Sequence, residues 1–144
     1  MLIGIDKLVS PELLKTLSEM GHGDEIVFGD SNFPAASHAQ RLIRADGLTI
    51  TGLLDAILPL FPIDYAVDHA AVMMDYSNES NNAPAVWRRY TEILGAYPNG
   101  DKPFIKLPKP EFYDRAKKAY CVLATSESEA FANLILRKGV VRDR

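Results

Sequence analysis

Segments with helical periodicity alternate along this chain with short apolar runs that fit buried strands. Ser10-Pro11-Glu12 is typical of a helix start, because Ser caps free backbone amides and Pro suits the first turn; Gly21 is a suitable helix end. Further helices are expected over 51–58 with Thr51 as the cap, 84–97 and 110–118, and strands over 26–28, 65–74, 104–105, 120–124 and 134–141. The alternation favours an α/β layered fold.

The length and the charge balance narrow the possible classes of protein. The 144 residues suit one domain, 1–144, with polar loops at 76–84 and 98–103 inside it. A net charge of −3 argues against a strongly basic nucleic-acid binder. No apolar run is long enough to cross a membrane. The single cysteine, Cys121, forms no internal disulfide, so we expect a cytoplasmic protein.

The densest polar cluster surrounds a histidine. His22 lies between two glycines, Asp24 and Glu25 follow, and Asp30 comes just after the next apolar run. Ligands of α/β folds gather at the carboxyl ends of strands, so we expect His22 and Asp30 near one ligand edge. An imidazole can accept and donate a proton near neutral pH, which indicates a general acid/base. The alternative is a solvated turn in which these side chains only cap neighbouring elements.

Two other chemistries use the same residues. His22, Asp24 and Asp30 are possible metal ligands, but their spacing matches no strong metal motif, so no metal is expected. A carboxylate pair formed by Asp24 with Asp30 or Glu25 would suit glycoside hydrolysis. The chain has no GxGxxG, Walker or GxSxG motif, which leaves nucleotide binding and serine hydrolysis without support.

The remaining candidate side chains favour structural roles. His38 is expected to face solvent, and His69 to lie in a strand. Cys121 fits a small buried hydrophobe rather than a nucleophile. Trp87 fits a core or interface aromatic on the helix over 84–97.

Several ungapped blocks, spread in order over nearly the whole chain, resemble the L-fucose mutarotase / D-ribose pyranase (RbsD/FucU) family. The blocks are Met-Gly-His-Gly-Asp-Glu-Ile at 20–26, Asp-Ser-Asn-Phe-Pro-Ala at 30–35, Ile-Arg-Ala-Asp-Gly at 43–47, Ile-Leu-Pro-Leu-Phe at 57–61, and two longer ones at 112–119 and 133–140. The blocks at 43–47 and 112–116 are typical of the fucose branch.

The resemblance implies a fold, an assembly and an activity. The fold would be a single-domain α/β/α sandwich of three layers, in a ring oligomer, commonly a homodecamer, with sites at subunit contacts. The activity would be interconversion of the α and β anomers of L-fucose or a related pyranose, without a cofactor. The partners would be a monosaccharide and further copies of the chain, with no nucleic acid and no membrane.

The resemblance also assigns roles to individual residues. His22 would be the catalytic acid/base, and Lys109 falls where the fucose branch usually has an arginine. The family's Tyr-x-Asn element falls on 131–133, so Phe131 stands where the family has a tyrosine, and Tyr120 is a candidate for supplying the missing hydroxyl. The implied sugar-binding residues are Asp30, Lys109, Phe131, Ala132 and Asn133, with Asp24 and Tyr120 as possible supports.

Three alternatives to a mutarotase stay open at this point. The same scaffold could serve as a non-catalytic sugar-binding or transport-accessory protein, which the phenylalanine at 131 would favour. It could be a purely structural oligomer that binds no sugar. It could also be a metal-dependent sugar isomerase, which would lose activity on chelation.

Overall fold

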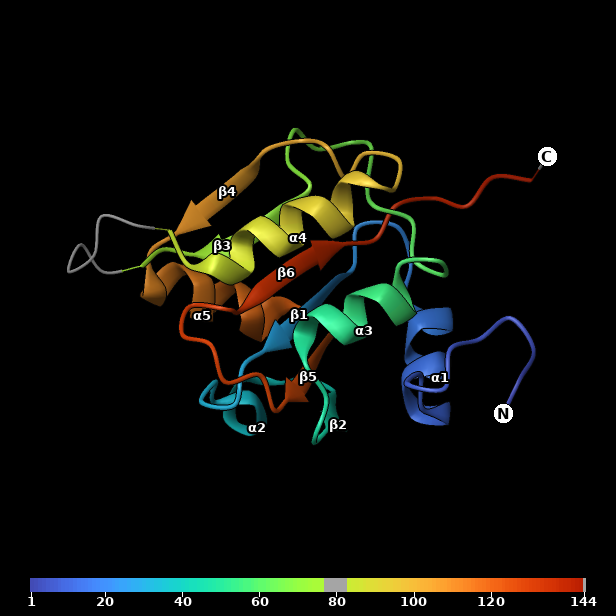
Figure 1. The fold of residues 1–144 in the computed structure, drawn as a ribbon, viewed down its shortest axis with the longest axis horizontal. Coiled ribbons are helices and arrows are strands. Elements are labelled where there is room, and N and C mark those ends of the chain that lie inside the picture. The colour runs from blue at the N-terminus through green and yellow to red at the C-terminus, as the bar shows by residue number, and fades with distance from the viewer. Residues whose placement is uncertain (77–82, 144) are drawn as a thin grey trace.

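The computed structural model describes residues 1–76 and 83–143, which form a six-stranded sheet in the order β2-β5-β1-β6-β3-β4 (Figure 1). The strands are β1 (Glu25–Gly29), β2 (Leu42–Ala45), β3 (Ala71–Met74), β4 (Phe104–Leu107), β5 (Cys121–Thr125) and β6 (Leu134–Arg137). β6 runs antiparallel to β1 and β3, and the other neighbours are parallel. The carboxyl ends of β1 to β5 and the start of β6 therefore share one edge of the sheet.

Helices cover both faces of this sheet. They are α1 (Pro11–Glu19), α2 (Ala35–His38), α3 (Ile50–Ile57), α4 (Ala85–Gly95) and α5 (Lys109–Lys118). The buried side chains of α1, α3 and α4 join one hydrophobic cluster, and those of α2 and α5 join a second one. This confirms the layered α/β fold that the sequence pattern predicts and the three-layer α/β/α sandwich that the family resemblance implies.

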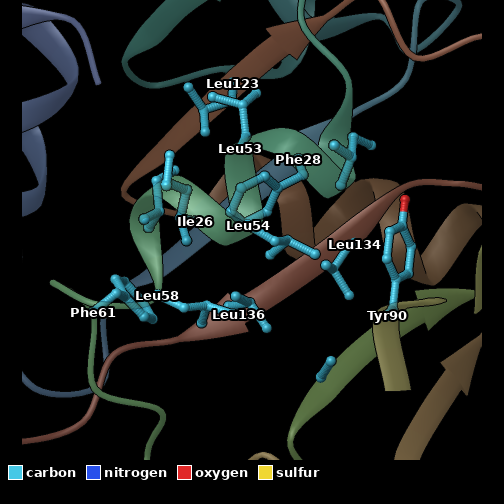
Figure 2. Close-up of a cluster of buried hydrophobic side chains, with 14 of the residues drawn as sticks. Ile26, Phe28, Leu53, Leu54, Leu58, Phe61, Tyr90, Leu123, Leu134 and Leu136 are labelled. Carbon is cyan, nitrogen blue, oxygen red and sulfur yellow. The ribbon is translucent and has the colours of Figure 1, made fainter. Parts of the chain in front are cut away.

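The two clusters arise from side chains that alternate along fully buried strands. In β1, Ile26 and Phe28 point into the cluster of α1, α3 and α4, whereas Val27 points into the opposite cluster. In β6, Leu134 likewise joins the cluster of α1, α3 and α4, and Ile135 joins the opposite one. Figure 2 shows the first cluster, with Ile26, Phe28 and Leu134 gathered around α3.

The helix α1 begins where its sequence predicts, and α3 begins slightly earlier than predicted. Ser10 caps α1 through its Oγ, which accepts a hydrogen bond from the backbone N–H of Leu13 at 3.1 Å. The expected cap Thr51 is wrong: Thr49 caps α3, and its Oγ1 accepts from the N–H of Gly52. Both threonines precede the same apolar face, so periodicity alone does not choose between them.

Two predicted strands are shorter than expected. The strand expected over 65–74 is only Ala71–Met74. Before it, the carbonyl oxygens of Tyr65 and Val67 accept hydrogen bonds from the Lys102 ammonium and not from a neighbouring strand. His69 therefore lies before β3 and not within a strand. The strand expected over 134–141 ends at Arg137. The short elements α2 and β2 were not predicted.

Other expectations concern single residues and one loop. Cys121 is fully buried and Trp87 nearly so, which confirms their core roles. His38 is half-buried and packs against the rings of Phe33 and Tyr113, so the expectation that it faces solvent is only partly met. Most of the loop expected over 76–84 lies outside the described residues. Among those described, no helix has the length and apolarity needed to cross a membrane.

Candidate active site

One cluster of predicted site residues lies at the carboxyl end of β1. Asp30 follows the last residue of β1, and Asn133 precedes the first residue of β6, which is the neighbouring strand. The backbone N–H of Asp30 donates to the side-chain Oδ1 of Asn133 at 2.7 Å, which locks the two residues together. The structure thus brings together two residues that are 103 positions apart in the chain.

Asp30 has an unusual electrostatic setting. Burial raises the pKa of its carboxyl, and the nearby Glu127 adds to this effect, although the backbone N–H groups of Asn32 and Phe33 oppose it. The Asn32 N–H donates to Oδ1 of Asp30 at 3.0 Å. A carboxylate held in this way can accept hydrogen bonds from the hydroxyls of a ligand.

The other predicted sugar-binding residues lie at the same end of the sheet. Lys109 is the first residue of α5, directly after β4, and its exposed ammonium lies 5.5 Å from the centre of the Tyr113 ring. Phe131 packs against the cluster under α2 and α5, and Ala132 is fully buried. Asp30, Lys109 and 131–133 thus share one edge, and Tyr113 joins them as an aromatic that the sequence analysis did not select.

A second cluster surrounds His22 at the opposite end of β1. His22 lies on the turn between α1 and β1, where the carboxylate of Asp24 accepts from the N–H of Gly21 at 2.7 Å. Gly23 has a φ of 90°, and a Cβ there would come within 3.0 Å of the Arg137 guanidinium. A glycine is therefore required for the turn to bring His22 so close to β6.

A buried aspartate holds the imidazole of His22. Nε2 of His22 lies 2.9 Å from Oδ1 of Asp64, whose side chain is only 1% exposed. Oδ2 of Asp64 accepts from the Nε–H of Arg137 at 2.6 Å, and Oδ1 also accepts from the N–H of Ala66 at 3.0 Å. Burial alone would raise the pKa of Asp64, but the donors on Ala66, His22 and Arg137 together hold it below its ordinary value.

The ionised Asp64 fixes the tautomer of His22. A carboxylate can only accept hydrogen bonds, so Nε2 of a neutral His22 must carry the proton and Nδ1 must be the basic nitrogen. Among the described residues, no group forms a hydrogen bond with Nδ1, and the side chain is 41% exposed. The Tyr65 ring stacks on the imidazole with centres 5.8 Å apart. His22 therefore presents a basic nitrogen beside an open surface.

The two clusters are separated by the full length of β1. His22 precedes its first residue and Asp30 follows its last, and five residues at about 3.3 Å each put the two groups more than about 16 Å apart. The expectation that both lie at one ligand edge is therefore wrong within a single chain. Tyr120 precedes β5 at the His22 end, and its hydroxyl donates to Glu19 at 3.1 Å. Within one chain it cannot replace the hydroxyl that Phe131 lacks.

The metal alternative does not fit this placement. Asp24 is engaged with Gly21, and Asp30 lies at the far end of β1 from His22. Among the described residues, no three His, Cys, Asp or Glu side chains are grouped so that they could hold a metal ion.

Asp64 and Arg137 belong to the site but were not predicted from the sequence. Asp64 comes directly after the apolar run that ends at Ile63, and a lone acid in such a place could have been a signal of a buried charge. Arg137 lies within the last predicted strand, where it and Lys138 are two basic residues among apolar ones and give the same signal. Neither residue has a local motif, because their contact depends on β6 pairing beside the His22 turn.

Comparisons with known proteins all relate this chain to a single family. The model of the RbsD / FucU transport protein family matches residues 3–141. The fucose mutarotase of Mus musculus is 46% identical over 144 residues, covering 96% of this chain and 94% of its own. The L-fucose mutarotase of Haemophilus influenzae strain 86-028NP is 45% identical over 140 residues, covering 97% of each chain. The crystal structure of the fucose mutarotase from Streptococcus pneumoniae, in complex with L-fucose, superimposes with a TM-score of 0.93 at 46% identity, covering 98% of this chain and 100% of that one.

Proposed function

The chain belongs to the RbsD / FucU transport protein family, and we propose that it is an L-fucose mutarotase. The enzyme interconverts the α and β anomers of L-fucose and is therefore an isomerase. The observation that carries the proposal is the full-length similarity to fucose mutarotases, one of them solved with L-fucose bound. The basic imidazole and the paired Asp30 and Asn133 are the groups that this reaction needs.

We assign the proton transfers to His22. Nδ1 of His22 takes the proton from the O1 hydroxyl, the O1–H electron pair forms the C1=O1 double bond, and the C1–O5 bond breaks with its electron pair going to O5. The imidazolium of His22 then returns its Nδ1 proton to O5, which leaves an open-chain aldehyde and a neutral His22. Rotation about the C1–C2 bond presents the other face of the aldehyde, and reversal of the same steps closes the ring as the other anomer. Asp64 keeps the proton on Nε2 and stabilises the imidazolium that forms. General acid/base groups typically contribute about 10²–10⁴-fold to a rate.

We assign sugar binding to the opposite cluster. The carboxylate of Asp30 and the polar side chain of Asn133 suit hydroxyl groups, and Lys109 offers a cationic donor at the same edge. Phe131 and Tyr113 supply apolar surface for the carbon face of the ring. No cofactor and no metal is part of this proposal.

The separation of the two clusters leads us to propose that each site is built from two chains. A monosaccharide carries its hydroxyls within a few ångströms of one another, so it cannot reach His22 and Asp30 of the same chain. A second copy placed against the His22 end could bring its own Asp30 and Asn133 beside His22. A head-to-tail contact of this kind closes into a ring or grows without limit, and we propose a closed ring. The number of ten chains, a homodecamer, is the one that the family resemblance implies.

The surface at the His22 end supports an interface of this kind. A groove of about 360 Å³ lies there, lined by Phe61, Tyr65, Val140 and Val141 among others. Tyr65 is 49% exposed and Val141 75% exposed, which is costly for apolar side chains that remain in water. We also propose a cytoplasmic location, which the lack of any possible internal disulfide supports.

Saturation-transfer proton NMR on the anomeric signals of L-fucose tests the proposed function. Exchange between the α and β signals should increase with protein concentration and persist in a chelator, and D-ribose, D-galactose and D-glucose measured in parallel should exchange less. Binding of L-fucose without faster exchange would select the non-catalytic sugar-binding protein. Loss of exchange in the chelator would select the metal-dependent isomerase.

A further inference from the structure

We propose that Trp87 and Tyr90, both on α4, are positioning residues that hold the sugar-binding segment 131–133 in its working conformation. The inference rests on the proposed function, because it concerns the same site. It adds two residues that touch no sugar themselves and act through the backbone of the segment.

The segment 131–133 begins in a backbone conformation that a phenylalanine rarely adopts. Phe131 has a φ of 56°, in the left-handed region that favours glycine. A bulky residue persists there only where its surroundings hold it, and such residues concentrate at functional sites. Neighbouring groups must therefore hold Phe131 in this conformation.

Two side chains of α4 hold successive carbonyl groups of the segment. The indole Nε1–H of Trp87 donates to the carbonyl oxygen of Phe131 at 2.8 Å. The hydroxyl of Tyr90 donates to the carbonyl oxygen of Ala132, also at 2.8 Å, in a fully buried contact. The next residue, Asn133, accepts from the backbone N–H of Asp30 through Oδ1. Every residue of the segment is thus tied to a different partner.

The two donors come from a rigid part of the core. Trp87 and Tyr90 are three residues apart on α4, which places them on one face of the helix. Tyr90 is fully buried, and Figure 2 shows it standing beside Leu134, the first residue of β6. Burial raises the pKa of the Tyr90 phenol far above its ordinary value, so the hydroxyl stays protonated and remains a donor.

A third contact joins the same two parts of the molecule. The guanidinium of Arg89 pairs with Glu129 at 2.6 Å, just before the segment. Both side chains are well exposed, so this pair contributes little by itself. The pair shows that α4 lies alongside the residues that precede the segment 131–133. The buried donors of Trp87 and Tyr90 hold the backbone of the segment itself.

The variants Trp87→Phe and Tyr90→Phe test the proposal, because each removes a donor and keeps an aromatic ring. A buried carbonyl left without a donor should let the segment move, so we expect each variant to raise KM for L-fucose roughly ten-fold while kcat falls much less. The dissociation constant of L-fucose should rise by a similar factor.

Two control variants on α4 separate positioning from general stability. Thr91→Val removes a hydroxyl whose hydrogen bond stays within α4, to the carbonyl of Trp87, and should change neither KM nor kcat. Leu94→Ala opens the core at the other end of α4 and should lower Tm with KM unchanged. A role of Trp87 and Tyr90 in stability alone would make their variants behave like Leu94→Ala.

Trp87 also supplies a direct spectroscopic signal, because it is the only tryptophan in the chain. Its single indole N–H resonance should shift when L-fucose is added and when Tyr90 is changed to Phe. Wild-type KM and dissociation constants in both variants, or an equal rise of KM in Leu94→Ala, would overturn the inference. A wild-type protein without anomer exchange would refute the proposed function instead, and the indole titration would still decide whether α4 controls sugar binding.

Discussion

Nε2 of His22 lies 2.9 Å from Oδ1 of Asp64, although the two residues are 42 positions apart in the sequence. The aspartate is buried and the histidine is open to solvent, so the pair joins a fixed anion to an accessible base. Arg137 holds the other carboxylate oxygen of Asp64. These contacts determine which nitrogen of His22 exchanges protons.

The variant Asp64→Asn should slow anomer exchange. An amide presents either a donor or an acceptor to Nε2, so it no longer selects one tautomer of His22 and no longer stabilises the imidazolium. We expect kcat for L-fucose exchange to fall by about 10²-fold, with a smaller change in KM. Asp46→Asn, at an exposed acid that among the described residues forms an ion pair with Arg44 alone, is the matched control and should leave both constants unchanged.

Asp64 should also make the free energy of unfolding depend on pH. Its folded-state pKa lies below the ordinary 3.8, so between these two values the unfolded chain binds more protons and stability rises with pH. The contribution of Asp64 is therefore complete above about pH 4 and is lost as pH falls through its folded pKa. Urea unfolding at pH 7, 4 and 3 should show a smaller acid loss in Asp64→Asn than in wild type. Equal losses in the two proteins would contradict this role.

The variant Phe131→Tyr should improve the enzyme. Phe131 is half-buried beside Asn133, and a hydroxyl there would add one hydrogen-bonding group at the sugar-binding edge. A single such bond contributes about 0.5–1.5 kcal/mol, so we expect kcat/KM for L-fucose to rise roughly two- to ten-fold. Phe104→Tyr, on a half-buried ring at the start of the edge strand β4, which β6 and β3 separate from β1, is the control. Equal kcat/KM values in wild type and Phe131→Tyr would remove residue 131 from the site.

The layered fold could be predicted from the sequence because its long elements have strong local signals. The Ser10 cap and the apolar face after it define α1, and the buried run at 26–28 defines β1. Short elements lack such signals: β2 has four residues, and only its parallel pairing with β5 makes it a strand. The segment 65–70 has strand-like composition, yet the ammonium of Lys102 holds its carbonyl groups in a bend.

The candidate site could be predicted only in part, for a topological reason. His22 and Asp30 belong to recognisable blocks, but sequence proximity suggested that they share an edge, and β1 separates them. The pairing of β6 with β1 brings Arg137 beside the His22 turn, and the bridge between Ile63 and Lys138 brings Asp64 there; no local pattern encodes either contact. Trp87 fits a core aromatic from the sequence, and only the structure reveals its bond to the Phe131 carbonyl.

We propose a mutarotase site made from the His22 end of one chain and the Asp30 end of another. The most direct test co-expresses His22→Ala and Asp30→Asn chains with different affinity tags, isolates mixed oligomers, and measures the exchange of L-fucose anomers by saturation-transfer NMR. Each variant alone should be nearly inactive. Mixed oligomers should recover about one quarter of the wild-type exchange, since half of the chains carry each intact end. Exchange in the mixture no greater than in the separate variants would contradict a site shared between chains.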